Sequence, residues 1–146
     1  MRAFQAMKKE VVFVNPATSI AEARKYMREF GIRHIPVVES GKLAGIVSDG
    51  DILLASTLRE GRIDVPDRPV SSIMSRNVVT CFPTSSLKDI AAAMIRLQIS
   101  CIPVVIDRRI LGIVTSTDLL RIIASHPDAV GMGNGSGIDL DALRSA

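Results

Sequence analysis

The sequence predicts an α+β fold made of two tandem β-α-β-β-α modules that pack together about a pseudo-twofold axis. First, the 146 residues match the size of one ordinary domain. Second, the pattern of the first half returns in the second half at a constant offset. Third, 47% of the residues are hydrophobic while only 3% are aromatic, so aliphatic side chains must fill the interior. Modules of this size bury too little surface alone, so we expect the two copies to pack together.

The repeat is measurable without any alignment of relatives. Shifting the chain by 67 residues places 7–53 on 74–120 without a gap, with 16 identities in 47 positions. About three identities are expected by chance, so the match indicates a duplication. The densest matches are Ile35–Val38 on Ile102–Val105 and Gly45–Val47 on Gly112–Val114.

Each copy carries the same order of local signals. In the first, a β-branched run ends at Pro16, which removes a backbone donor. Ser19 is followed three residues later by Glu22, the spacing of a helix start, and Gly31 suits a helix end. The first copy therefore predicts a strand over 11–14, a helix from Ser19 to Gly31, strands over 34–38 and 43–48, and a helix over 49–58.

The second copy predicts the same series: a strand over 78–81, a helix over 86–97, strands over 101–106 and 110–115, and a helix over 116–124. We expect modules at 1–58 and 73–125, joined by a linker at 59–72 that contains two prolines. The last part, 126–146, is glycine-rich and predicts a flexible tail. Within it, 138–143 has the pattern of a short helical turn and of a possible binding segment.

Composition and motifs argue against several classes of function. Residues 1–125 carry 17 basic and 12 acidic side chains without a basic run, so binding to nucleic acid is disfavoured. The chain has two cysteines, no metal-ligand spacing and no nucleophile with an oriented base, so we expect no metal site, no cofactor and no catalysis. Reduced thiols and short apolar runs predict a cytoplasmic protein without a membrane span.

The duplicated motifs resemble those of CBS (cystathionine beta-synthase) domains, which occur in pairs called Bateman modules. The resemblance covers residues 1 to about 125 and rests on h-P-V-V at 35–38 and 102–105, followed by G-I-V-[ST]-x-x-D at 45–51 and 112–118. It implies a stand-alone CBS-domain protein with two equivalent clefts for an adenosyl ligand: AMP, ADP, ATP or S-adenosylmethionine. It also implies a homodimer and a separate regulated protein that responds to the ligand.

By this resemblance, one cleft is formed by Thr115, Thr117 and Asp118, with the adenine near Val11 and Ile32, Arg33 and His34 of the opposite module. Hydroxyls beside free N–H groups at a helix start suit a phosphate, and an aspartate accepts hydrogen bonds from ribose hydroxyls. The other cleft takes Ser48 and Asp51, with Val78, Ile99, Ser100 and Cys101 opposite.

The clefts differ in two respects. Thr117 stands where the first copy has Gly50, which favours the Asp118 cleft for a ribose-phosphate. Arg33-His34 stand where the second copy has Ser100-Cys101, and Arg33 favours a phosphate near Asp51. Alternatively, the serine, threonine and aspartates only cap helices. The chain is then a ligand-independent dimerisation module that uses the apolar helix residues Ile52, Leu53, Leu119, Leu120 and Ile123.

Overall fold

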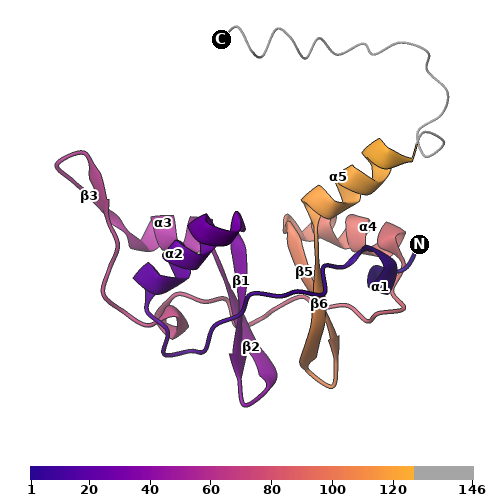
Figure 1. Ribbon diagram of the computed structural model, residues 1–146, viewed down its shortest axis with the longest axis horizontal. Helices are drawn as coiled ribbons and strands as arrows, with labels where there is room; N and C mark the ends of the chain where they lie inside the picture. Colours follow the sequence, from indigo (N-terminus) through magenta and orange to yellow (C-terminus); the bar gives the residue numbers. More distant parts are fainter. Residues whose placement is uncertain (127–146) are drawn as a thin grey trace, which may run out of the picture.

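The computed structural model describes residues 1–126 (Figure 1). It confirms two α+β modules, each with an antiparallel β-hairpin and two helices. The expected tail, apart from its first residue, and the segment 138–143 lie outside the described residues. The first module contains α2 (Ile20–Phe30), β1 (His34–Glu39), β2 (Lys42–Ser48) and α3 (Asp49–Ala55). The second contains α4 (Leu87–Leu97), β5 (Cys101–Ile106), β6 (Arg109–Thr115) and α5 (Ser116–Ser125).

The helix starts follow the sequence signals. The hydroxyl of Ser19 accepts a hydrogen bond from the Glu22 N–H at 3.1 Å, and Gly31 ends α2 in the left-handed region with φ of 63°. The Glu22 carboxylate does not complete a capping box, because it accepts a hydrogen bond from the Tyr26 hydroxyl at 2.8 Å. Ser86 caps α4 in the same way as Ser19 caps α2.

The first expected strand of each module is reduced to one residue. Val14 pairs in parallel with Val37 of β1, and Cys81 pairs in parallel with Val104 of β5. The predicted strands at 11–14 and 78–81 were therefore too long. In the first module, Val11 and Val12 are not paired in the sheet. They line a cleft that also contains residues of the second module.

The two modules exchange the segments that precede them. The amino-terminal helix α1 (Ala3–Ala6) packs against α4, α5 and β6 of the second module, as Figure 1 shows beside the N-terminus. Ala3 is fully buried in the second core, whereas Val70 and Met74 are buried in the first. Each core is therefore completed by the segment that leads into the other module, which ties the two halves together.

The exchanged segments are held by matching backbone pairs. Lys8 exchanges two hydrogen bonds with Ile113 of β6, and Ser75 exchanges two with Ile46 of β2, all between 2.9 and 3.0 Å. A Cβ on Gly112 would lie 2.8 Å from the Lys8 carbonyl oxygen, and one on Gly45 would lie 2.8 Å from that of Ser75. The glycine of each G-I-V motif is therefore required by the close approach of a crossing backbone.

The connection between the modules holds a hairpin that the sequence did not reveal. Strands β3 (Thr57–Arg59) and β4 (Arg62–Asp64) pair antiparallel through a turn at Glu60-Gly61, where both φ angles are positive. The predicted helix over 49–58 ends earlier, at Ala55, since Thr57 and Leu58 belong to this hairpin. Its side chains are exposed, so no burial pattern marks it in the sequence.

Candidate ligand-binding cleft

The segment Thr115–Asp118 joins β6 to α5 and fixes one carboxylate in place. The backbone N–H and the hydroxyl of Thr115 donate to Asp118 Oδ2 at 2.9 and 2.7 Å, and the Asp118 N–H returns to Thr115 Oγ1 at 3.3 Å. This is a capping box, in which the helix start satisfies its own backbone donors. Oδ2 is thereby occupied, which leaves Oδ1 facing other groups.

Two cations approach the remaining oxygen of Asp118. Lys8 Nζ lies 3.4 Å and Arg121 Nη1 lies 3.6 Å from Oδ1. Asp118 is only 6% exposed, so it is a buried carboxylate whose charge needs such partners. Both cationic side chains are more than half exposed, so they are able to move away without opening the core.

Lys8 and Arg121 are not among the site residues that were predicted from the sequence. Lys8 lies 110 positions before Asp118 and reaches it only because its segment crosses β6. The repeat did contain a signal, since the equivalent residues in the other half are Ser75 and Leu54. Where one copy has a charged residue and the other has an uncharged one at the equivalent position, the two predicted sites differ in charge.

A cleft of about 220 Å³ lies between the modules next to these residues. It brings together most side chains expected at the Asp118 site, from both modules. They are Val11, Ile32, Arg33, His34, Thr115 and Thr117, whereas Asp118 is not itself among the lining residues. Ser100, which was expected opposite Asp51, lines this cleft instead. Lys8 and Arg121 add positive charge to the lining, and Glu10 is the acidic side chain among the lining residues.

His34 lies where the modules meet. Its Nε2 is 3.3 Å from the hydroxyl of Ser100, which occupies the position equivalent to Arg33 in the repeat. Burial lowers the pKa of His34, and the nearby Arg33 lowers it further, while Asp49 and Asp51 oppose the shift. A neutral imidazole at this place adds no charge to the cleft near neutral pH.

Asp51 is held by the same kind of helix-capping hydrogen bonds as Asp118, but it has fewer charged and hydroxyl groups near it. The Ser48 N–H donates to Asp51 Oδ2 at 2.8 Å, and the Asp51 N–H donates to Ser48 Oγ at 3.0 Å. Among the described residues, Asp51 takes part in none of the ion pairs, whereas Asp118 takes part in two. Gly50 provides no hydroxyl at the position of Thr117.

The side chains expected opposite Asp51 are not all at a surface. Cys101 is 6% exposed, and Ile99 packs against the second core, while Val78 is half-buried. Burial, together with the charge of Asp118, raises the pKa of the Cys101 thiol to about 12. Cys101 is therefore held as a neutral thiol, and its place in β5 is opposite Thr115, on the side of Asp118 rather than Asp51.

In residues 1–126, no group of three His, Cys, Asp or Glu side chains is placed to hold a metal ion. None of the helices in this part of the chain has the length and apolarity needed to cross a membrane.

The chain belongs to the CBS domain family, which matches it twice, at residues 2–57 and 70–125. It is 37% identical over 115 residues to the CBS domain-containing protein YhcV of Bacillus subtilis, covering 77% of this chain and 79% of YhcV. It is 40% identical over 106 residues to the L-aspartate semialdehyde sulfurtransferase of Methanocaldococcus jannaschii, covering 71% of this chain and 19% of the enzyme. The region shared with that enzyme is thus a small part of it.

Among solved structures, the chain is similar to the CBS domain pair of protein MJ0100 in complex with 5′-methylthioadenosine and S-adenosyl-L-methionine. The TM-score is 0.74 at 33% identity, and the match covers 85% of this chain and 96% of that one. The pairing of two CBS domains is thus a shared architecture, and the module is regulatory rather than catalytic in this family.

Proposed function

We propose that this protein is a regulatory module that binds a phosphorylated adenine nucleotide in the Asp118 cleft and passes its ligand state to a partner protein. The observation that carries the proposal is the buried, pre-positioned Asp118, whose ion-pair partners Lys8 and Arg121 line a cleft between the modules. The adenosyl ligands of the MJ0100 domain pair support the class of ligand.

The ribose, the phosphates and the adenine of a nucleotide each have a candidate binding group at the Asp118 cleft. The ribose hydroxyls donate to Asp118 Oδ1, displacing Lys8 and Arg121. These cations, together with Arg33 and the hydroxyls of Thr115 and Thr117, then face the phosphates at the start of α5. The adenine stacks on the apolar side of the cleft formed by Val11 and Ile32.

The charges favour a phosphate over a sulfonium. S-adenosylmethionine carries a positive sulfur where AMP carries a phosphate, and the cleft contributes Lys8, Arg33 and Arg121. One charge-assisted hydrogen bond is worth about 1.5–3 kcal/mol, which corresponds to an affinity preference of at least about tenfold. The Asp51 position has Ser75 and Leu54 as the equivalents of Lys8 and Arg121, so we expect a ligand to bind there more weakly.

Regulation requires that the ligand prefers one arrangement of the modules. Lys8 pairs its backbone with Ile113 of β6 and its ammonium group with Asp118. A phosphate that draws the Lys8 side chain away acts on the segment that ties the first module to the second. The change in inter-module geometry is then available to a separate protein.

The test is a thermal-shift screen followed by calorimetry with AMP, ADP, ATP, 5′-methylthioadenosine and S-adenosylmethionine. A ligand at one hundred times its Kd stabilises the fold by about 2.7 kcal/mol, a readily measured rise in Tm. We expect phosphorylated nucleotides to give the largest rise and Asp118→Asn to weaken binding at least about tenfold. Asp107→Asn, in the exposed β5–β6 turn, is the matched control.

Three outcomes would count against the proposal. If neither calorimetry nor Tm responds to any adenosyl ligand, nucleotide sensing is wrong for this chain. If S-adenosylmethionine alone binds, the assignment of the three cations to phosphates is wrong. If Asp118→Asn, shown to be folded by circular dichroism, binds like the wild type, the ligand does not use this cleft.

A second candidate function is a dimerisation module that acts without a ligand. Exposed apolar side chains favour it: Leu53 and Leu120 are 60% and 65% exposed, and Ile123 is 46% exposed. Ile52 is buried and Leu119 packs against the second core, so these two do not contribute to an exposed face as the sequence suggested. Light scattering of Leu120→Glu against wild type, with and without AMP, separates the two functions.

A further inference from the structure

The side chain of Lys8 contacts the same oxygen of Asp118 that a bound ribose needs. Thr115 occupies Oδ2 through its backbone N–H and its hydroxyl, whereas Lys8 Nζ lies 3.4 Å from Oδ1. Ribose hydroxyl groups that donate to Asp118 must therefore use Oδ1 as their acceptor. It follows that the ammonium group of Lys8 and a ribose compete for one atom.

The backbone of Lys8 is anchored, so that only its side chain is able to leave Asp118. Lys8 exchanges two backbone hydrogen bonds with Ile113 of β6, at 2.9 and 3.0 Å. Its side chain is 52% exposed, while that of Asp118 is buried. Because a lysine carries its charge on a flexible four-carbon stem, the ammonium group is able to turn from Oδ1 to another anion in the cleft while the backbone stays in place.

The other copy of the repeat makes the same backbone contact without a cation. Ser75 exchanges two hydrogen bonds with Ile46 of β2, in the same way as Lys8 does with β6. Asp51, the equivalent of Asp118, takes part in none of the ion pairs of the described chain. Neither the crossing of the segment nor the helix cap therefore requires the lysine, and its charge is available for selecting a ligand.

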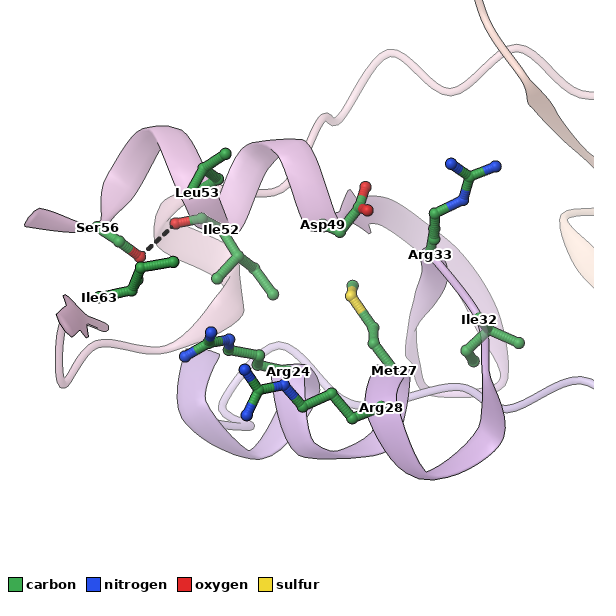
Figure 2. A pocket seen from close by; sticks show the side chains of 10 residues that line it. All are labelled: Arg24, Met27, Arg28, Ile32, Arg33, Asp49, Ile52, Leu53, Ser56 and Ile63. Atoms are coloured by element: carbon green, nitrogen blue, oxygen red, sulfur yellow. Dashed lines mark hydrogen bonds between the residues drawn. The ribbon is translucent and has the colours of Figure 1, made fainter. Parts of the chain in front are cut away.

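Arg33 is a second cation of the cleft, and it is not paired with a carboxylate. It belongs to none of the ion pairs within residues 1–126. Figure 2 shows its guanidinium group pointing away from the two arginines of α2, and Arg33 lines the Asp118 cleft together with Lys8. A phosphate that enters the cleft meets Arg33 directly, whereas it gains the charge of Lys8 only after Lys8 has left Asp118.

We propose that Lys8 is a specificity-determining residue that excludes adenosyl ligands without an anionic group from the Asp118 cleft. An uncharged ligand, such as 5′-methylthioadenosine, displaces the ammonium group from Oδ1 and offers it no new partner. AMP displaces it in the same way, but its phosphate then pairs with the ammonium group. This role rests on the proposed nucleotide site and adds to it a competition at Asp118.

The experiment is calorimetric titration of the full chain with AMP and with 5′-methylthioadenosine, comparing wild type with Lys8→Ser. Serine is the residue of the other copy, and Arg121, 3.6 Å from the same oxygen, leaves the buried carboxylate with a counter-charge. Since half-exposed ion pairs are weak, we expect the Kd of 5′-methylthioadenosine to fall about three- to fivefold. The variant lacks a charge-assisted contact to the phosphate, so we expect the Kd of AMP to rise about tenfold.

The opposite changes for the two ligands distinguish competition from simpler roles of Lys8. If Lys8 only attracts the phosphate, Lys8→Ser weakens the binding of AMP and leaves the uncharged ligand unchanged. If Lys8 only supports the fold, both ligands bind more weakly. Lys8→Met, which keeps the length of the side chain without its charge, is the second variant, and circular dichroism checks that both variants are folded.

Lys9→Ser is the matched control. It makes the same change in net charge one residue away, at an exposed side chain that neither lines the cleft nor belongs to an ion pair of the described chain. We expect it to leave the Kd of both ligands within about twofold of wild type, because exposed charges outside the cleft are screened by salt.

The role of Lys8 is refuted if AMP binds to wild type but neither Lys8→Ser nor Lys8→Met gains affinity for 5′-methylthioadenosine. That result leaves the proposed nucleotide site intact. It is also refuted if Lys9→Ser reproduces the opposite changes, since they then follow from net charge. If neither ligand binds to wild type or to the variants, the nucleotide site and the role of Lys8 are both wrong.

Discussion

Gly112 lies on β6 where the amino-terminal segment crosses it, and its replacement by alanine tests the exchange of segments between modules. An added Cβ would lie 2.6 Å from Met7 Sδ and 2.8 Å from the Lys8 carbonyl oxygen. The methionine is able to move, but the carbonyl is fixed by the hydrogen bond that it accepts from Ile113 at 3.0 Å. The crossing backbone must therefore retreat from β6.

The cost follows from these contacts. Overpacking a tight interior costs about 1–3 kcal/mol, and each backbone hydrogen bond lost adds about 1 kcal/mol. We therefore expect Gly112→Ala to lower the free energy of unfolding by about 2–4 kcal/mol. For a chain of this length that corresponds to a fall in Tm of about 10 °C. Gly45→Ala is expected to cost the same, since the Ser75 carbonyl lies 2.8 Å from its added Cβ.

The assay is urea unfolding followed by circular dichroism, with Gly50→Ala as the matched control. Gly50 is in the first turn of α3, and an added Cβ there has as its nearest neighbour Ser48 Oγ at 3.6 Å. The control is expected to gain up to about 1 kcal/mol from helix propensity. If Gly112→Ala and Gly50→Ala agree within about 0.5 kcal/mol, the amino-terminal segment does not pack on β6 as described.

Three further predictions concern single side chains. Cys101, with a thiol pKa of about 12, is expected to resist iodoacetamide in the native protein at pH 8 and to react once guanidinium unfolds the chain. Because burial lowers the pKa of His34 in the folded state, the unfolded state binds the proton first. Stability is therefore full above pH 6.5 and falls as the pH drops below it, and urea unfolding of His34→Gln is expected to show a smaller fall between pH 7.5 and 5.5. The exposed Arg59–Asp64 pair at 3.8 Å is expected to contribute less than about 1 kcal/mol, so thermal unfolding of Asp64→Asn is expected to match wild type closely.

Most of the fold was predictable from the repeat, because the motifs and helix caps of each copy act on the residues next to them. The motifs at Ile35–Val38 and Gly45–Val47 predicted the hairpins, and the serine caps predicted the helix starts, as the structure confirms. The hairpin over 57–64 escaped prediction because its exposed strands carry no burial pattern. The exchange of segments escaped because it depends on contacts between residues far apart, such as Ala3 with Ser85.

The site was predictable to the extent that each copy carries its own motif. Thr115, Thr117 and the residues expected opposite them line one cleft, and their role in binding a ligand stays a prediction. What local reasoning missed is the pair of cations at Asp118, because Lys8 reaches it from the exchanged segment. Comparing the copies position by position, rather than seeking identities alone, would have marked Lys8 against Ser75 and Arg121 against Leu54.

The two copies differ in where their positively charged side chains lie. In the Asp118 cleft, lysine and arginine replace serine and leucine, so positive charge gathers on one side of the pseudo-twofold axis near the modules' boundary. On the helix side the asymmetry is reversed, since Arg24 and Arg28 belong to the first module and their equivalents are apolar. Duplication alone gives two equal clefts and two equal helix faces. For the proposed nucleotide, the first asymmetry predicts one preferred site, because the Asp118 side has Lys8 and Arg121 where the Asp51 side has Ser75 and Leu54.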